Sequence, residues 1–371
     1  DINISDLSPM MQQYAEVKSR YKEELLFFRL GDFYELFFED ALTASHELEL
    51  TLTGKNAGLK ERVPMCGIPY HSAKPYIEKL VNKGFRVAIC EQLEDPKSTK
   101  NMVKRDVVEV ITKGTLVDLE FLPEKDFNYI GSIIDYKYTY LLTYIDISTG
   151  EVNAVFINHN NESIINEVLN LNLKELVIKN DFPLELINIF KNSYGINISI
   201  SEEELENKYE SIYENVEDER IVLGIKHILY YLHIKELKEL SHLSHVNILK
   251  KDNFLRMDVH TVRNLELVET LRLKERKYSL IWLLDKTKTA PGARVLRNWL
   301  MNPLKDKSEI EKRYNYIDLL NLNFLPREEL RNDLYEVYDL ERLCGKVICG
   351  SLNARDLLQI KKSLAVIPDI N

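Results

Sequence analysis

The pattern of apolar and polar residues divides the chain into three stretches. In the first 115 residues, short apolar runs such as Leu25–Leu30 and Phe85–Cys90 alternate with amphipathic segments, which is typical of a mixed α/β unit. From residue 128, runs rich in β-branched and aromatic residues predict strands over 129–136, 138–147 and 152–157. After about residue 218, apolar residues recur at helical spacing almost to the end. The pattern therefore predicts two α/β units followed by a helical region.

Punctuating residues set the element boundaries in the first unit. Ser8 followed by Pro9 predicts the start of a helix, because proline is favoured at the first helical position. A helix over 73–83 is expected to end at Gly84. Residues 54–58 predict a loop, and residues 62–71 predict an ordered, turn-rich segment.

The stretch 28–40 holds five aromatic residues and allows two interpretations. Asp32 followed three residues later by Glu35 is the pattern of a capping box, which predicts a helix beginning at Phe33 and gives Glu35 a purely structural role. That interpretation leaves Phe33 and Tyr34 unexplained, since two large aromatic residues at an exposed helix start need a surface to pack against.

Charge is unevenly distributed along the chain. The net charge of −10 argues against a protein that simply coats nucleic acid. Residues 51–115, however, hold twelve lysines and arginines against seven acidic residues, a surplus of five positive charges. This basic zone is either a phosphate-binding surface or an ordinary solvated face.

The composition of the chain indicates the cellular compartment in which the protein is expected. The longest apolar run falls short of the roughly 20 residues that span a bilayer, and residues 1–3 do not resemble a signal peptide. The four cysteines are too few and too scattered for a disulfide framework, which favours a reducing cytoplasm and buried structural thiols: Cys66, Cys90, Cys344 and Cys349.

Motifs for common chemistries are absent from the sequence. It contains no phosphate-binding loop of the Gly-x4-Gly-Lys-Ser/Thr type, no dinucleotide fingerprint and no Gly-x-Ser-x-Gly elbow. His242 and His245 lack a third metal ligand. Asp135, Asp146 and Glu151 could form a two-metal nuclease site, although acids are also common beside hairpin turns. We therefore expect no metal site and keep the nuclease as an alternative.

Several stretches, in order along the chain, resemble the MutS family of bacterial DNA mismatch-repair proteins. Three of them resemble the mismatch-recognition domain of that family: Phe28–Phe37, Pro64–His71 and Val87–Gln92. One resembles its connector domain: Tyr144–Gly150. Four resemble the first part of its core or lever domain: Asn264–Leu267, Leu284–Thr287, Arg294–Leu300 and Asp339–Leu343. A small departure is Lys113, where the family usually has proline.

The resemblance implies a multidomain α/β plus α fold. Its expected parts are a mixed α/β mismatch-recognition domain over 1–115, a linker over 116–127, an RNase H-like α/β connector over 128–240 and the first part of the helical core over 241–371. Family members continue into a clamp and a dimerising ATPase domain. The chain is therefore expected to be an N-terminal fragment without enzymatic activity of its own.

The resemblance also implies a role for the stretch 28–40. In this family a Phe-x-Glu motif enters the minor groove at a mismatch, and Phe33 and Glu35 occupy its two positions. A phenylalanine can wedge between base steps, which costs less at a mispaired base. Glu35 is expected to hydrogen-bond a base edge, because a carboxylate among phosphates is otherwise repelled. Lys55 and Arg62 are the candidates for contacts with the DNA backbone.

The expected partner is double-stranded DNA with mismatches or small loops. For full-length members the resemblance implies a homodimer, ATP and Mg²⁺ as cofactors of a DNA-dependent ATPase, a MutL-type repair partner and a sliding clamp, in a cytoplasmic, nucleoid-associated protein. No cofactor is expected in this chain, and no membrane contact. The alternative function is a structural module that docks repair partners and binds little DNA.

Overall fold

The computed structural model describes residues 4–94, 102–117, 122–250 and 253–370. The chain forms two compact units. Unit 1 comprises Asp1–Thr115 and Leu232–Lys238, and unit 2 comprises Leu116–Tyr231 and Glu239–Asn371. Lys97 and Lys100 of the predicted basic zone lie outside the described residues, as does part of the predicted linker.

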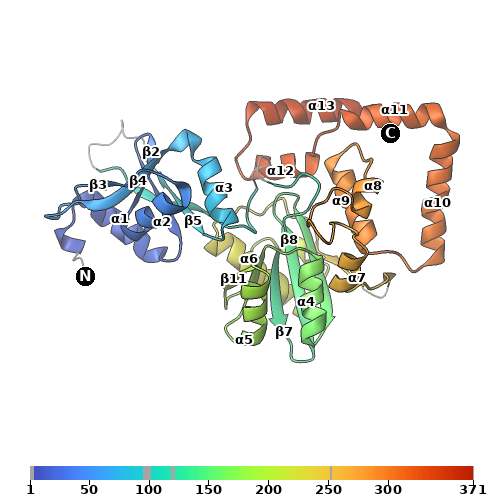
Figure 1. The fold of residues 1–371 in the computed structure, drawn as a ribbon, viewed down its shortest axis with the longest axis horizontal. Helices are drawn as coiled ribbons and strands as arrows, with labels where there is room; N and C mark the ends of the chain where they lie inside the picture. Colours follow the sequence, from blue (N-terminus) through green and yellow to red (C-terminus); the bar gives the residue numbers. More distant parts are fainter. Residues whose placement is uncertain (1–3, 95–101, 118–121, 251–252, 371) are drawn as a thin grey trace. The chain divides into compact units, whose positions relative to one another are not determined.

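Unit 1 is built on one six-stranded sheet flanked by helices (Figure 1). Its strands are β1 (Leu25–Leu30), β2 (Phe33–Phe37), β3 (Thr53–Lys55), β4 (Val63–Pro69), β5 (Val87–Gln92) and β6 (Arg105–Ile111). Its longer helices are α1 (Pro9–Arg20), α2 (Phe38–Leu48) and α3 (Lys74–Asn82). The strand order is β3-β4-β2-β1-β5-β6, so β1 and β2 are central strands.

Helix α1 covers part of one face of this sheet. Met11, Tyr14 and Val17 are spaced three apart, lie on one side of the helix and are all buried. The ring of Tyr14 meets Phe28 and Phe37 edge-on, with centroids 5.4 and 4.9 Å away. These aromatic contacts anchor α1 over the middle of the sheet.

Helices α2 and α3 contact each other and pack on the opposite face. The side of α2 that faces the sheet is formed by small and aliphatic residues, Ala41, Ala44 and Leu48, so the helix approaches β4 closely. The thiol of Cys66 lies 3.6 Å from the carbonyl oxygen of Ala41 and is buried. Burial raises the pKa of this thiol to about 11, which keeps it protonated and unreactive.

A short segment from later in the sequence, Leu232–Lys238, completes unit 1. Its buried carboxylate, that of Glu236, accepts a hydrogen bond from Nη2 of Arg86 at 2.6 Å. The carbonyl oxygen of Glu236 also accepts from the N–H of Val110 at 3.2 Å. Next to it, the buried ammonium of Lys238 forms an ion pair with Glu109. A sequence reading cannot assign this segment to unit 1, because its partners are more than a hundred residues away.

Unit 2 contains a second six-stranded sheet (Figure 1). Its strands are β7 (Ile130–Asp135), β8 (Thr139–Asp146), β9 (Glu151–Asn158), β10 (Glu175–Ile178), β11 (Asn197–Ile200) and β12 (Asn247–Ile248). The order is β11-β10-β7-β8-β9-β12, with β7, β8 and β9 antiparallel and the outer strands parallel to their neighbours.

Helices cover both faces of the second sheet. Helix α4 (Asn161–Asn170) packs on one face through the buried side chains of Ile164 and Val168. Helix α6 (Glu219–Tyr230) packs on the other face so closely that a Cβ atom at Gly224 would lie 2.4 Å from Cδ2 of Leu141. The short helix α5 (Leu184–Asn188) follows β10. A sheet covered on both faces explains why β8 is buried along nearly its whole length.

The rest of unit 2 is helical, as the periodicity predicts. Its helices are α7 (Val259–Asn264), α8 (Leu280–Leu284), α9 (Ala290–Met301), α10 (Lys307–Leu322), α11 (Phe324–Tyr335), α12 (Leu340–Ile348) and α13 (Ala354–Ile370). Six of them begin with a side chain that caps a backbone N–H of the first turn, from Asp258, Ser279, Thr289, Asp306, Asp339 and Asn353. Helices α10 and α11 bury none of their residues.

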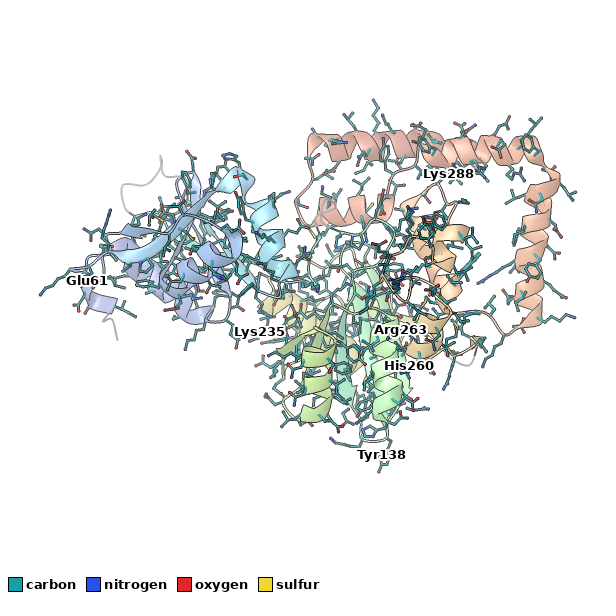
Figure 2. All side chains as sticks on the ribbon, viewed as in Figure 1. Glu61, Tyr138, Lys235, His260, Arg263 and Lys288 are labelled. Carbon is teal, nitrogen blue, oxygen red and sulfur yellow. The ribbon has the colours of Figure 1, made fainter. Side chains whose placement is uncertain are left out.

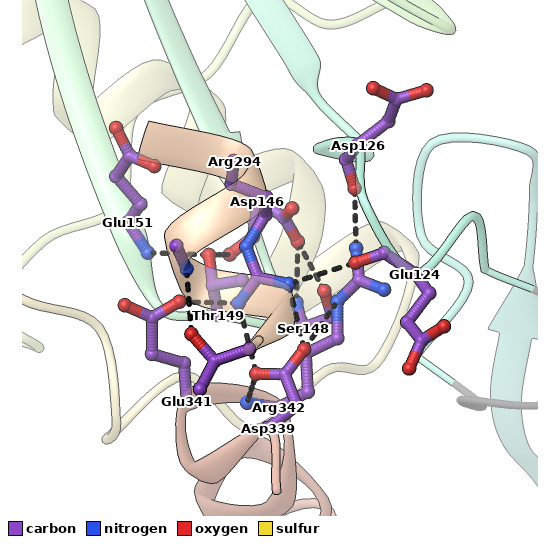
Figure 3. A network of polar contacts seen from close by, with 12 residues as sticks. Glu124, Asp126, Asp146, Ser148, Thr149, Glu151, Arg294, Asp339, Glu341 and Arg342 are labelled. Atoms are coloured by element: carbon purple, nitrogen blue, oxygen red, sulfur yellow. Dashed lines mark hydrogen bonds and ion pairs between the residues drawn. The ribbon is translucent and has the colours of Figure 1, made fainter. Parts of the chain in front are cut away.

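Two buried arginines tie α9 and α12 to the segment that precedes the second sheet (Figure 3). Arg294 forms a two-pronged ion pair with Asp339, at 2.7 and 2.9 Å, and also contacts Glu341 at 2.5 Å. Arg342 donates to the carbonyl oxygens of Pro123 and Asp126, at 3.0 and 2.6 Å. Burial alone would lower the pKa of Arg294, but the hydrogen bonds to its acidic partners raise it. This network holds three separate segments of unit 2 together.

The predicted fold class is confirmed: two mixed α/β sheets precede a helical region. The division into three domains remains a prediction, because unit 2 contains both the expected connector and the helical part. Cys66 and Cys90 are buried as expected, but Cys344 is exposed and Cys349 is only half-buried, so the expectation of a buried thiol is wrong for these two. Within the described residues, no helix combines the length and apolarity required to cross a membrane.

Candidate nucleic-acid interface

Phe33 and Glu35 lie on strand β2, and the helix predicted to begin at Phe33 is absent. Residues 33–35 pair with β1 on one side, residues 33–37 pair with β4 on the other, and α2 begins only at Phe38. The capping-box interpretation of Asp32 and Glu35 is therefore wrong. Phe38 itself adopts a positive φ of 51°, the point at which the chain turns from strand to helix.

The physical reason for this error lies in the turn and in the neighbouring strands. Gly31 and Asp32 form a two-residue loop between β1 and β2, and Gly31 has the positive φ that such hairpin loops require. A central strand gains backbone hydrogen bonds on both sides, whereas a capping box satisfies only two donors. Aromatic residues also favour strands over helix starts.

Alternation along β2 separates the site residues from the core. Phe33 and Glu35 point to one face of the sheet, and Tyr34 points to the other. The hydroxyl of Tyr34 donates a hydrogen bond to Oε1 of Glu91. Burial, together with this acceptor, raises the pKa of Tyr34, so the hydroxyl remains a donor. The central residue of the motif thus anchors the strand and leaves its two neighbours free to form a surface.

Phe33 is exposed, unlike two other aromatic residues on the same face of the sheet. Helix α1 covers Phe28 and Phe37 on the same face, and both are fully buried. Phe33 lies next to the hairpin loop, and 46% of its surface is exposed. A large apolar ring held on a rigid central strand and left open to solvent is the feature expected of a wedge.

Glu35 is half-buried and carries a counter-charge. Its Oε2 forms an ion pair with Nζ of Lys55, and the two side chains are 16% and 30% exposed. Lys55 lies on the short strand β3, so the prediction of a loop over residues 54–58 is wrong for its first residues. Lys55 also lies 5.6 Å from the centre of the Phe37 ring. The predicted phosphate-contact residue therefore lies directly beside the predicted mismatch-contact residue.

Arg62 lies in the loop of the β3–β4 hairpin, directly before Val63, which is paired with Lys55. Arg62 is exposed, as is its neighbour Glu61, which projects into solvent in Figure 2. Strand β4 runs from Val63, next to Arg62, to Pro69, which is paired with Phe33. At ~3.3 Å per residue, the two ends of this strand are about 20 Å apart. The predicted turn-rich segment over 62–71 is mostly this strand, so that prediction is wrong. Arg62 and Phe33 are not brought together.

Much of the basic zone is engaged within unit 1. Ion pairs with acidic residues hold Lys55, Lys83 and Arg86. Arg105 is buried and donates to the carbonyl oxygen of Arg29 at 2.7 Å and to Oε1 of Gln13 at 3.0 Å. The zone is therefore not a continuous phosphate-binding surface, and exposed cations such as Arg62 are the ones available to a partner.

The alternative sites predicted in unit 2 do not assemble. Asp146 and Glu151 face each other across β8 and β9, but Asp135 lies near the other end of β8, opposite Tyr140. Among the residues that the structure describes, no three potential metal ligands converge. Asp146 instead accepts hydrogen bonds from the N–H groups of Asn128 and Ser148, both at 2.9 Å. These carboxylates stabilise the loops around the sheet.

Sequence reasoning missed three residues of the site. Tyr14 packs on Phe37, Glu91 anchors Tyr34, and Gly67 lies on β4 directly opposite Glu35. The available signal was the composition of residues 33–37, because four of the five are aromatic or aliphatic and aromatic residues favour strands. The partners on β4 and β5 required the register of the sheet.

Comparisons with known proteins agree with the resemblance. Residues 8–120 match the family model of MutS domain I, and residues 260–371 match that of MutS domain III. The chain is 44% identical over 363 residues to the DNA mismatch repair protein MutS of a Geobacillus species, covering 97% of this chain and 42% of that protein.

Two further relatives carry the same name. The MutS protein of Bacillus cytotoxicus is 44% identical over 369 residues, which is 99% of this chain and 41% of the relative. That of Listeria monocytogenes is 45% identical over 372 residues, or 99% and 43%. The chain thus spans about two fifths of the length of the curated relatives it matches. Phe33, Glu35, Lys55 and Arg62 all fall within the part matched by domain I.

Proposed function

The chain belongs to the MutS family, and from this premise we propose that unit 1 senses mispaired or unpaired bases in double-stranded DNA. Phe33 acts as the wedge that enters the minor groove, and Glu35 contacts the base that the wedge displaces. The observation that carries the proposal is the exposed ring of Phe33 on a central strand, two residues from a half-buried carboxylate on the same face.

The wedge selects its site through the stiffness of the duplex. Stacking of an aromatic ring on a base contributes roughly 1–3 kcal/mol and is independent of sequence. Opening a base step costs a few kcal/mol in intact DNA and less where a base is mispaired or unpaired. Phe33 therefore gains the same stacking energy at every base step, but the cost of opening the step is lower at a mispaired or unpaired base. The property that is recognised is thus the local deformability of the DNA.

Lys55 makes the approach of Glu35 to DNA possible. A lone carboxylate would be repelled by the phosphates, but the ion pair with Lys55 offsets its charge. When Glu35 accepts a hydrogen bond from a displaced base, the Lys55 ammonium is placed to contact a nearby phosphate. Arg62, in the hairpin loop next to the end of β3 that carries Lys55, is also proposed to contact the backbone and to fix register.

The functions that need further domains are proposed only for family members of full length. ATP and Mg²⁺ binding, homodimerisation, and docking of a MutL-type partner and a sliding clamp are proposed for members of full length, on the resemblance alone. For this chain the proposal is mismatch sensing without catalysis.

The proposal is tested by comparing two duplexes of the same sequence, one fully paired and one with a single unpaired base. Fluorescence anisotropy of the 371-residue chain at low salt is expected to show weak binding with a preference for the heteroduplex, since one exposed patch makes few phosphate contacts. Equal binding to both duplexes would contradict the proposal. Absence of any binding would favour the partner-docking module, and strand cleavage on adding Mg²⁺ would favour the nuclease.

Replacing Glu35 by alanine is expected to weaken discrimination about tenfold while matched DNA binds equally or slightly more tightly. A hydrogen bond to a charged group contributes about 1.5–3 kcal/mol, and this bond is lost only at the displaced base. Matched DNA instead meets one negative charge fewer and a released Lys55 ammonium. The anisotropy titration with both duplexes measures the change.

The matched control for this variant is Glu39→Ala, which removes an exposed carboxylate from α2, on the opposite face of the sheet. It changes the net charge equally and should leave discrimination unaltered. Weaker binding of Glu35→Ala to matched DNA would contradict the charge argument.

A further inference from the structure

Gly67 occupies the position on β4 that lies between the two proposed DNA contacts. Gly67 is paired in register with Glu35, and Pro69, two residues later, is paired with Phe33. Residues directly opposite each other in a sheet share a face, so Gly67 lies on the same face as both contacts. A Cβ atom at this position would lie 3.7 Å from Cδ1 of Phe33 and 3.7 Å from Cγ of Glu35.

The fold does not require glycine at this position. Gly67 has no positive φ, and the distances from a Cβ atom to its neighbours are those of ordinary van der Waals contact. Gly58 shows the contrast: its φ is +91° and a Cβ atom there would lie 2.7 Å from the backbone nitrogen of Ser8. Glycine in the interior of a strand weakens it and marks places where a ligand or another backbone approaches closely. The nearest neighbours of a Cβ atom at Gly67 are the side chains of Phe33 and Glu35 and the carbonyl oxygen of Tyr34, all at 3.7 Å, so none of them would have to move.

The backbone of Gly67 is also open along one edge. The N–H of Tyr70 donates to the carbonyl oxygen of Asp32, and alternation along an antiparallel ladder then turns the N–H of Gly67 away from β2. On that outer side β3 pairs only with Val63–Met65. The peptide groups of Gly67 therefore face an edge that no strand of the described sheet covers.

We propose that Gly67 is a specificity-determining residue: the gap it leaves between Phe33 and Glu35 seats the minor-groove edge of the displaced nucleotide. This inference rests on the proposed function and extends it to a third residue. The sugar and base edge lie against the bare backbone of β4, where the base comes within reach of Glu35. Because a hydrogen bond requires about 2.7–3.2 Å between heavy atoms, even a methyl group that lifts the nucleotide breaks the contact.

The test replaces Gly67 by alanine and by valine in the 371-residue chain and measures binding to the paired duplex and to the duplex with an unpaired base. Heteroduplex binding is expected to weaken about tenfold with alanine and further with valine, whereas binding to the paired duplex stays within twofold. Thermal unfolding of unit 1, followed by near-ultraviolet circular dichroism, is expected to be unchanged or shifted upwards for the alanine variant, because the fold has room for the methyl group.

The outcomes separate this inference from the function on which it rests. If the unaltered chain does not prefer the heteroduplex, the proposed function fails. If the unaltered chain prefers it and Gly67→Ala retains that preference, the role of Gly67 is overturned. A large fall in melting temperature with equal loss on both duplexes would also overturn it, since Gly67 would then be needed for folding. Gly67→Ser, which adds a polar atom at the same place, is expected to behave as alanine does.

Discussion

Replacing Phe33 by alanine abolishes the preference for mismatched over matched DNA and leaves the stability of unit 1 almost unchanged. The ring supplies the stacking that offsets the opening of a base step, roughly 1–3 kcal/mol, so the expected loss of heteroduplex affinity is about 5- to 150-fold. Since 46% of Phe33 is already exposed, little buried apolar surface is lost. Anisotropy titrations and the melting temperature of unit 1 together measure both effects.

Phe37→Ala is the matched control on the same strand. Phe37 points to the same face but is fully buried against Tyr14, so its truncation is expected to cost about 3–5 kcal/mol of unfolding free energy. The two variants should therefore separate a binding defect from a folding defect. If Phe33→Ala lowers the melting temperature as Phe37→Ala does, Phe33 is a core residue and the wedge proposal fails.

Replacing Arg294 by alanine is expected to destabilise unit 2 by about 3–5 kcal/mol, the usual cost of removing one partner from a buried ion pair. The guanidinium is 1% exposed, and its loss leaves the carboxylates of Asp339 and Glu341 without their shared counter-charge (Figure 3). The link from α9 to the carbonyl oxygen of Glu124 is lost as well. For a unit of this size the melting temperature should fall by roughly 6–20 °C.

Tryptophan fluorescence measures this effect selectively, because the only two tryptophans of the chain, Trp282 and Trp299, lie in unit 2. The control is Arg220→Ala. Arg220 is exposed and pairs with Asp218 at 2.7 Å, so its removal should leave the melting temperature almost unchanged. Equal effects of the two substitutions would show that the network around Arg294 contributes no more than a surface pair.

The sequence predicts the elements well where local signals agree. Periodicity and end residues predict the helix at Pro9, the strand at Leu25–Leu30 and the helices after residue 255. These predictions are confirmed. The prediction fails for residues 33–37, because Asp32 and Glu35 carry a strong local capping signal. The register with β1 and β4 overrides that signal, and register is a property of the whole sheet.

The candidate site shows the same limit more sharply. Phe33 and Glu35 were identified as site residues through the resemblance to the MutS family, because no local sequence rule distinguishes them from the start of a helix. The ion pair between Glu35 and Lys55 joins residues on strands β2 and β3, which touch only through β4. Gly67 is unremarkable in the sequence, and its place between the two contacts becomes visible only when β4 is paired with β2. The buried environment of Arg294 likewise depends on segments far apart in the chain.

The most direct test of mismatch sensing by Phe33 is the fluorescence of 2-aminopurine placed as the unpaired base in a duplex, because stacking quenches this base analogue and unstacking restores its emission. With saturating amounts of the 371-residue chain, we expect a clear rise in emission from the unpaired base and none from 2-aminopurine in the matched duplex. The Phe33→Ala variant should give no rise at concentrations that still saturate the DNA. An equal rise with and without the Phe33 ring would contradict the account.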